Sequence, residues 1–202
     1  MNDKKEKKTK STRRNLLEWG VIIGIGAILY LTGLHTEVIG TLQRGLLATG
    51  LIKPSIPEEA EEHPPASMEF YFADENSSVQ NLAAFEGDVI FLNIWASWCP
   101  PCIAEMPSIQ NLYNDLKNTD GITFLLVSVD EDFERAKGFM ERREFEMPIY
   151  HFRTKQPGTY ESTMIPTTYV ISPNKRLVME KRGFAKYDTE EFKTFLKDLA
   201  ES

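Results

Sequence analysis

The feature that most constrains the fold is a continuous apolar segment, residues 89–95, which leads directly into a pair of cysteines, Cys99 and Cys102. An uncharged run of this length is typical of a central strand that is buried on both faces of a sheet. Residues 100–117 follow with apolar side chains at the spacing of one helical face. The cysteines therefore stand where a buried strand passes into a helix, and this order predicts an α/β fold.

The position of the cysteine pair favours thiol chemistry. The first turn of a helix has unpaired backbone N–H groups and a partial positive charge, and both stabilise a thiolate. We therefore expect the pKa of Cys99 to lie below the free value of about 8.5. Pro100 and Pro101 suit a first helical turn, where N–H groups need no helical partner. The spacing also lets the sulfur of Cys102 reach that of Cys99.

A scaffold disulfide and a zinc site are the structural alternatives for this pair. Small domains that depend on disulfides carry several widely spaced cysteines, whereas this chain has two cysteines three positions apart. A zinc site needs two further ligands. The three histidines are His35 in a predicted membrane segment, His63 in a predicted linker, and His151. The sequence therefore favours a redox-active dithiol and implies no metal and no cofactor.

The remaining globular part alternates strand and helix patterns before it ends in a hairpin. Strands are expected at residues 68–72, 122–129, 167–171 and 177–182, and helical segments at residues 79–85, 133–143 and 189–200. The last two strands flank a turn at residues 172–175. Early alternation with a late hairpin predicts a mixed sheet flanked by helices.

The N-terminal part has the pattern of a membrane anchor. Residues 1–18 hold seven Lys and Arg against three Asp and Glu, a net charge of about +4. Residues 19–36 carry no formal charge and are long enough to cross a bilayer as a helix. No A-x-A-like site follows, so we expect an uncleaved signal anchor rather than a signal peptide. The positive-inside rule places residues 1–18 in the cytoplasm and the later domain outside the cell membrane or in a periplasm.

Residues 37–66 connect the predicted anchor to the globular part. Apolar residues recur at helical spacing in residues 37–52, which predicts an amphipathic helix that lies on the outer membrane surface or extends the anchor as a stalk. Residues 53–66 are rich in Pro and Glu and form an extended linker. Residues 67–202 then form the globular domain. Because the chain has a net charge of −7, the residues after the basic tail carry about −11, which argues against nucleic-acid binding.

The stretch from Asn93 to Cys102, which reads NIWASWCPPC, resembles the thioredoxin superfamily, and more narrowly the membrane-anchored TlpA/ResA-type proteins of bacterial envelopes. The resemblance covers residues 67–200. It implies a thioredoxin-like mixed β-sheet flanked by helices, preceded here by a transmembrane helix. It also implies a thiol–disulfide oxidoreductase whose redox-active disulfide joins Cys99 and Cys102.

The resemblance extends to further site residues. The sequence Ile165-Pro166-Thr167-Thr168 resembles the cis-proline loop of the family, which would place Pro166 against the two sulfurs. The backbone of Ile165 could then pair with an extended substrate, and Trp98 and Thr167 would complete the substrate-binding face.

Glu105 matches the acidic residue that the family places behind its active site. We expect it to be a buried proton acceptor for Cys102, although an exposed carboxylate in the first helical turn is the alternative. Gly183, after the last strand, is expected near the site. One departure from general thioredoxins is Asn93, where they carry a buried Asp, so Glu105 would take over its role.

The function implied by the resemblance is the reduction of disulfides in exported proteins, including apocytochromes c during cytochrome c biogenesis. A membrane electron donor of DsbD/CcdA type would then re-reduce the pair.

A thiol oxidase or isomerase is the alternative within the same chemistry, and a reduction potential would separate them. A peroxidase is disfavoured by Ala96, where peroxiredoxins carry Thr. A copper-binding module of the Sco type would use C-x-x-x-C rather than the C-x-x-C found here, with His151 as its candidate ligand. The sequence does not indicate an oligomeric state.

Overall fold

The computed structural model describes residues 15, 18–27, 30–31, 34–57, 63–153, 158–160 and 164–202. The chain separates into two compact units, Met1–Ile39 and Gly40–Ser202. Residues 18–27 are helical, but the predicted anchor at residues 19–36 includes positions 28–29 and 32–33, which lie outside the described residues. Within the part of the chain that the structure describes, no helix has both the length and the apolar character needed to span a bilayer.

The second unit is built on a mixed sheet, as the sequence predicts. Within the described residues its strands follow the order β2-β1-β5-β4-β3-β6-β7. The central strands β3 and β4 pair in parallel, as do β4 and β5, and the other neighbours pair antiparallel. The bounds are β1 Tyr71–Ala73, β2 Val79–Asn81, β3 Val89–Trp95, β4 Ile122–Ser128, β5 Ile149–Phe152, β6 Thr167–Ile171 and β7 Leu177–Arg182.

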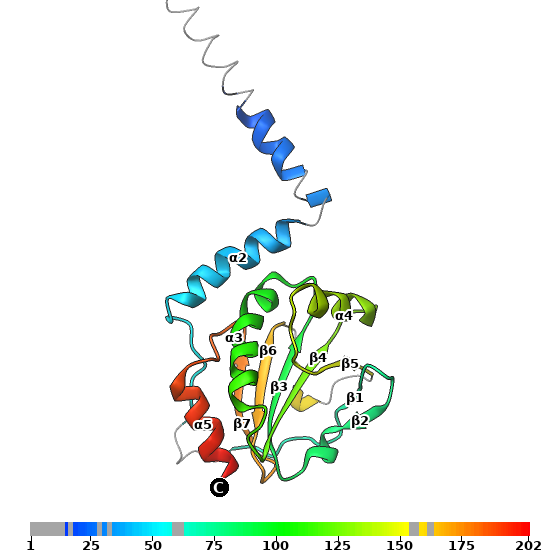
Figure 1. The fold of residues 1–202 in the computed structure, drawn as a ribbon, viewed down its shortest axis with the longest axis vertical. Coiled ribbons are helices and arrows are strands. Elements are labelled where there is room, and N and C mark those ends of the chain that lie inside the picture. The colour runs from blue at the N-terminus through cyan, green and yellow to red at the C-terminus, as the bar shows by residue number, and fades with distance from the viewer. Residues whose placement is uncertain are drawn as a thin grey trace, which may run out of the picture. The chain divides into compact units, whose positions relative to one another are not determined.

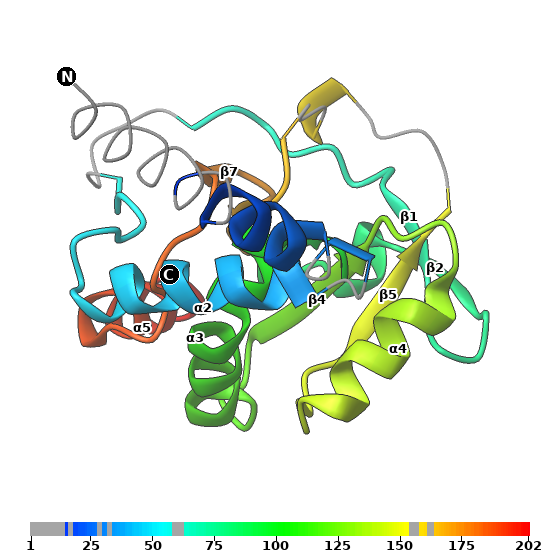
Figure 2. The ribbon, with the colours of Figure 1, turned by 90° about the horizontal axis from the view of Figure 1, so that it is seen from above.

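Helices cover one face of this sheet. The bounds of the α-helices are α2 Leu34–Ala48, α3 Pro100–Leu116, α4 Phe133–Arg142 and α5 Glu190–Ala200, and those of the short 3₁₀ helices are η1 Leu82–Phe85 and η2 Gly158–Tyr160. Helices α3, α4 and α5 lie on the same side of the sheet, and η2 lies on the other (Figures 1 and 2). The parallel connections from β3 to β4 and from β4 to β5 run in the same direction, so right-handed crossovers place α3 and α4 on one face.

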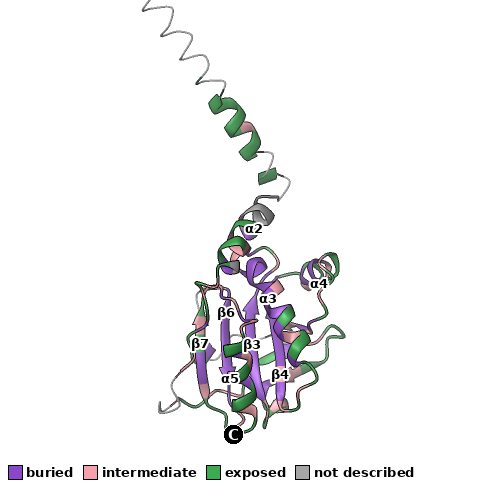
Figure 3. Ribbon diagram, turned by 60° about the vertical axis from the view of Figure 1, so that its left-hand side comes forward, coloured by how far each residue is buried: buried purple, intermediate pink, exposed green. Residues whose placement is uncertain are grey.

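Alternation along β3 divides the core between the two faces. Val89, Phe91 and Trp95 pack in the cluster that includes residues of α3, α4 and α5. Ile90, Leu92 and Ile94 belong to a second cluster on the other face. Every residue of β3 is buried, which explains the continuous apolar run (Figure 3). Asn93 alternates with Phe91 and Trp95 and therefore faces the helices.

The sequence located most of these elements but missed two short strands. The bounds predicted for β3, β6 and β7 are confirmed. The helical turn predicted over residues 79–85 is wrong at its start, because Val79–Asn81 pairs with β1 and only Leu82–Phe85 is helical. The strand predicted at residues 68–72 lies at Tyr71–Ala73, and β5 was not predicted.

Parts of the predicted connecting region contact the sheet domain. Ala66 N–H donates to the carbonyl of Lys175, and Leu177 N–H donates to that of Pro64, each at 2.9 Å. Ile52 and Ile56 pack against the helix-side core. In α2, Gly40 is buried, and a Cβ there would lie 3.3 Å from Cγ2 of Ile103 in α3. The compact unit therefore begins well before residue 67.

Candidate active site

The two cysteines lie at the N-terminus of α3, where the sequence predicts them. They form a disulfide, and their Cα atoms are 5.3 Å apart. Cys99 is the N-cap of the helix, and the backbone N–H of Cys102 points at its sulfur at 3.3 Å. Pro100 and Pro101 fill the first helical positions, which need no N–H donor. Cys99 retains 4% of its surface exposed and Cys102 none, so a reaction partner reaches the pair through Cys99.

A tight turn carries the chain from β3 to this helix. Cys99 N–H donates to the carbonyl of Ala96 at 3.2 Å and closes a turn whose central residues are Ser97 and Trp98. Trp98 is 54% exposed beside the reactive sulfur, whereas Trp95 at the end of β3 is fully buried. The turn therefore presents one indole to solvent next to Cys99.

The loop before β6 faces the same sulfur. The Ile165–Pro166 peptide bond is cis, as the family resemblance implies, and the carbonyl oxygen of Ile165 lies 3.8 Å from the Cys99 sulfur. Gly183 N–H donates to the carbonyl of Pro166 at 2.8 Å, so the residue after β7 does lie at this loop. Thr167 is buried, and its hydroxyl donates to the carbonyl of Met164 at 2.7 Å. The Thr167 side chain therefore stabilises the loop from inside and does not face solvent, where the predicted substrate-binding face would lie.

Glu105 is fully buried on α3, as expected for the acidic residue behind the pair. One carboxyl oxygen accepts from the Asn93 amide at 2.9 Å and the other from Ala185 N–H at 3.1 Å. Burial removes water from the carboxyl group and raises its pKa to about 8, although both hydrogen bonds and the charge of Lys181 act in the opposite direction. Desolvation is the dominant effect and keeps a proton on Glu105 at neutral pH.

A buried polar network that the sequence did not reveal surrounds this carboxyl group. The Asn93 amide also donates to the hydroxyl of Thr168 at 2.9 Å, and Tyr187 O–H donates to the same hydroxyl at 2.8 Å. Burial raises the pKa of Tyr187 well above its ordinary value, with the Glu105 charge acting in the same direction. In the sequence, this network was indicated only by Asn93, the polar residue inside the otherwise apolar run of β3.

His151, the candidate copper ligand, is engaged elsewhere. Its ring stacks on Phe133 with the centroids 5.1 Å apart, and Nε2 lies 3.1 Å from the carbonyl oxygen of Asp130. Among the described residues, no group of three or more His, Cys, Asp and Glu side chains is arranged to hold a metal ion. The redox pair therefore has no metal-binding cluster around it within that part of the chain.

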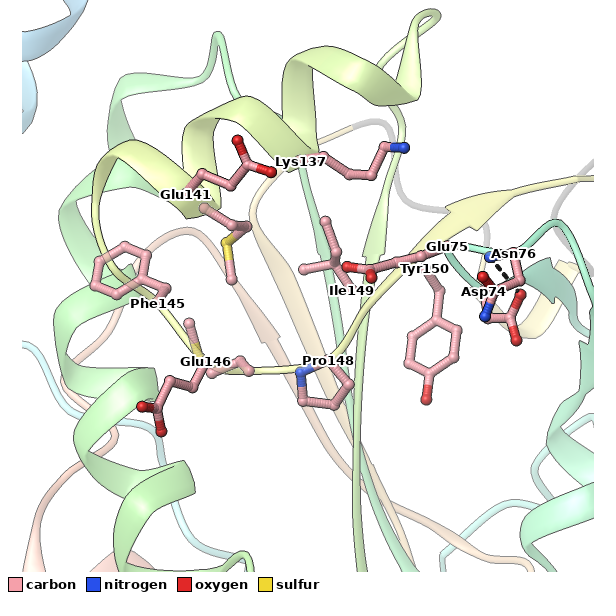
Figure 4. A pocket seen from close by; sticks show the side chains of 12 residues that line it. Asp74, Glu75, Asn76, Lys137, Glu141, Phe145, Glu146, Pro148, Ile149 and Tyr150 are labelled. Atoms are coloured by element: carbon pink, nitrogen blue, oxygen red, sulfur yellow. Dashed lines mark hydrogen bonds between the residues drawn. The ribbon is translucent and has the colours of Figure 1, made fainter.

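A cavity of about 520 Å³ lies between α4, β5 and the turn after β1 (Figure 4). Met140, Pro148 and Tyr150 contribute apolar surface to it, and Glu75 and Glu141 contribute carboxylates. None of the site residues predicted from the sequence lines this cavity. The chemistry of the cysteine pair is thus separate from it.

Comparisons with known proteins agree with this geometry. The family model described as Redoxin matches residues 59–195. The chain is 34% identical over 127 residues to the thiol-disulfide oxidoreductase ResA of Oceanobacillus iheyensis, a match that covers 62% of this chain and 64% of that relative. It is 30% identical over 115 residues to the ResA protein of Bacillus subtilis, with 56% of this chain and 64% of that relative covered. Each match therefore spans less than two thirds of the relative's length.

The fold is also similar to solved structures. A thiol:disulfide interchange protein of the thioredoxin family from Chlorobium tepidum TLS aligns with a TM-score of 0.55 and 23% sequence identity. The alignment covers 69% of this chain and 98% of that structure. At this identity the likeness identifies the thioredoxin-like fold.

Proposed function

We propose that this chain, which belongs to the redoxin family, is a thioredoxin-like thiol–disulfide oxidoreductase of the ResA/TlpA type that reduces disulfide bonds in exported proteins. The observation that carries this proposal is the Cys99–Cys102 pair at the N-terminus of α3, with the sulfur of Cys99 close to the cis-proline loop. Cys99 is the nucleophile and Cys102 the resolving thiol.

The first step is attack by the reduced enzyme. The Cys99 thiolate is stabilised by the helix N-terminus and by the N–H of Cys102, which lies 3.3 Å from its sulfur. It attacks one sulfur of the substrate disulfide, forms a mixed disulfide, and displaces the second substrate sulfur as a thiolate. Because Cys102 is buried, the substrate meets Cys99 alone.

The second step needs a base for Cys102. The ionised form of Glu105, a minority at neutral pH because its pKa is about 8, takes the proton of the Cys102 thiol. The resulting thiolate attacks the Cys99 sulfur and expels the bound substrate sulfur as a thiolate, which solvent protonates. The pKa of Glu105, raised to about 8, is close to the free thiol value of about 8.5. Proton transfer between them is therefore nearly balanced in free energy. An ordinary exposed glutamate would be too weak a base for this task.

The substrate is proposed to bind as an extended segment. Its backbone pairs with Ile165, whose carbonyl lies beside the Cys99 sulfur, and Trp98 provides an exposed apolar contact. The Thr167 hydroxyl supports this arrangement through its bond to the Met164 carbonyl. Backbone pairing requires no particular side chains, so this mode suits a range of unfolded thiol proteins.

We place the enzyme outside the cytoplasm on a single membrane anchor. The uncharged residues 19–36 after a basic tail support this topology. Outside the cytoplasm the pair would need a membrane electron donor, for which a DsbD/CcdA-type protein is our candidate. Apocytochromes c before haem attachment are the proposed substrates, because their haem-binding cysteines must be reduced.

The exchange chemistry is tested with a soluble fragment, residues 40–202, in an insulin reduction assay. Cys99→Ser is expected to abolish activity because it removes the nucleophile. Cys102→Ser is the matched variant, since the chain has no other cysteine, and it should accumulate a mixed disulfide with the substrate. Retained turnover in Cys99→Ser would refute the nucleophile assignment.

The direction of electron flow is tested by the reduction potential of the same fragment. The fluorescence of Trp98 and Trp95 should report the redox state because both residues flank the pair. A potential near or below about −270 mV, that of thioredoxin, supports a reductant. A potential near about −120 mV, that of DsbA, would instead identify an oxidase or isomerase and rule out the proposed role in cytochrome maturation.

A further inference from the structure

A second buried carboxyl group, that of Asp130, lies beside the redox loop and takes no part in the proposed exchange. Asp130 follows β4 and is 1% exposed. Its Oδ2 accepts from the backbone N–H of Ser97 at 2.9 Å, and its Oδ1 accepts from the Ser97 hydroxyl at 2.7 Å. Both carboxyl oxygens are therefore directed at one residue of the turn that precedes Cys99.

The contacts of Ser97 matter because of its place in that turn. The turn from Ala96 to Cys99 is closed by one hydrogen bond, Cys99 N–H to the Ala96 carbonyl. In such a turn the N–H of the second residue has no partner inside the turn. Asp130, in the loop after β4, supplies that partner. Its carboxyl group therefore holds Ser97, the residue that directly precedes Trp98 and Cys99, in place.

Asp130 is itself held on two further sides. The Ser128 hydroxyl donates to its Oδ2 at 2.7 Å, and its own N–H donates to the Ser128 hydroxyl at 3.0 Å. The His151 ring contacts its carbonyl oxygen at 3.1 Å. Val129 N–H also donates to the Trp95 carbonyl at 2.9 Å, which fastens this segment to the end of β3. The acceptor is therefore rigidly placed relative to the turn.

We propose that Asp130 is a positioning residue for the nucleophile: it holds the Ser97–Trp98 turn so that Cys99 caps α3 with its sulfur against the Cys102 N–H. This inference rests on the proposed function, in which the Cys99 thiolate is the attacking group. Loss of the Asp130 acceptor would free Ser97 and weaken the contact of the Cys102 N–H with the sulfur. The thiolate would then be less stable and react at a lower rate at neutral pH.

Two substitutions of Asp130 separate positioning from charge. Asp130→Ala removes both acceptors and the charge. Asp130→Asn also removes the charge, but an amide oxygen at the Oδ2 position still accepts from Ser97 N–H, and the amide NH₂ can donate to the Ser97 hydroxyl. Asp132→Asn is the matched charge control, because Asp132 is exposed and caps α4 through a bond that Asn also makes.

The test measures alkylation of Cys99 by iodoacetamide as a function of pH. Each variant is made in the full 202-residue chain, in detergent micelles and in a Cys102→Ser background, so that a single thiol reports. In Asp130→Ala we expect the rate at neutral pH to fall about fivefold, as for the loss of one or two hydrogen bonds, and the midpoint of the pH profile to rise. Asp130→Asn and Asp132→Asn should react at the parent rate within the error of the assay, because each retains its hydrogen bonds.

The outcomes that overturn the proposal are distinct. A parental rate in Asp130→Ala refutes positioning, and an Asp130→Asn variant as slow as Asp130→Ala shows that the charge, not the acceptor, controls Cys99. If Asp130→Ala fails to fold, Ser97→Ala decides, since it removes one of the two bonds and should slow alkylation about twofold; an unchanged rate refutes the proposal. Iodoacetamide needs no protein substrate, so failure of insulin reduction would count against the proposed function alone.

Discussion

Glu105→Gln tests whether the carboxyl group behind the redox pair is buried with a proton affinity suited to a thiol. In the folded protein desolvation raises the pKa of Glu105 from 4.5 to about 8. Between these two pH values the folded state binds a proton that the unfolded chain has released. The free energy of unfolding of the wild type must therefore fall as the pH rises through this window, whereas glutamine has no proton to lose.

The size of the effect follows from the two pKa values. A shift of one pKa unit corresponds to about 1.4 kcal/mol, and integration from pH 5 to pH 9 gives about 4 kcal/mol lost by the wild type through this one group. Glutamine has one acceptor oxygen, so it can accept from only one of the two donors, the Asn93 amide and the Ala185 N–H. Its NH₂ group then faces the other donor, and the lost hydrogen bond costs about 1–3 kcal/mol at every pH. The variant should be the less stable protein near pH 5 and the more stable one near pH 9.

The measurement is urea unfolding of residues 40–202 at several pH values between 5 and 9. The oxidised protein is used because its disulfide-bonded cysteines do not titrate. Glu131→Gln is the control, since the side chain of Glu131 is exposed. If the stability difference between Glu105→Gln and wild type stays constant within about 1 kcal/mol across this range, the raised pKa is wrong and Glu105 loses its role as proton acceptor.

Two further substitutions test the frame around the site by the same unfolding assay. Gly183 has a φ of 75°, and no atom lies within 4 Å of an added Cβ. Gly183→Ala should therefore lower the free energy of unfolding by about 1–2 kcal/mol through backbone conformation alone. An unchanged stability would show that this backbone conformation carries no cost. Phe91 is fully buried, with ring centroids 5.3 Å from both Phe124 and Tyr187, so Phe91→Ala should destabilise the domain by about 3–5 kcal/mol. A loss below about 1 kcal/mol would mean that the surrounding core collapses into the cavity.

The sequence alone determined the central strands, the helices beside them and the redox pair. Each of these rests on a local signal: the uncharged run of β3, the helical spacing of α3, and prolines that suit a first turn after Cys99. Such patterns depend on residues that are close together in the sequence. They can therefore be recognised without knowing which distant segments pack against them. The expectation that Glu105 is buried came from the family resemblance. The alternative of an exposed carboxylate in the first helical turn is wrong, because α3 begins at Pro100 and Glu105 lies beyond its first turn, fully buried.

Tertiary structure decided the features that depend on pairing between distant segments. The short strand β2 pairs with β1, and the short strand β5 pairs with both β1 and β4. Three or four residues carry too little periodicity to reveal such strands in the sequence. The donors to Glu105 come from Asn93 and Ala185, and the acceptor for Ser97 comes from Asp130. No local pattern links these residues, since each bond exists only because the fold brings separate segments of the chain together. The sequence supplies the reactive sulfurs, and the folded sheet sets the proton affinity and the geometry around them.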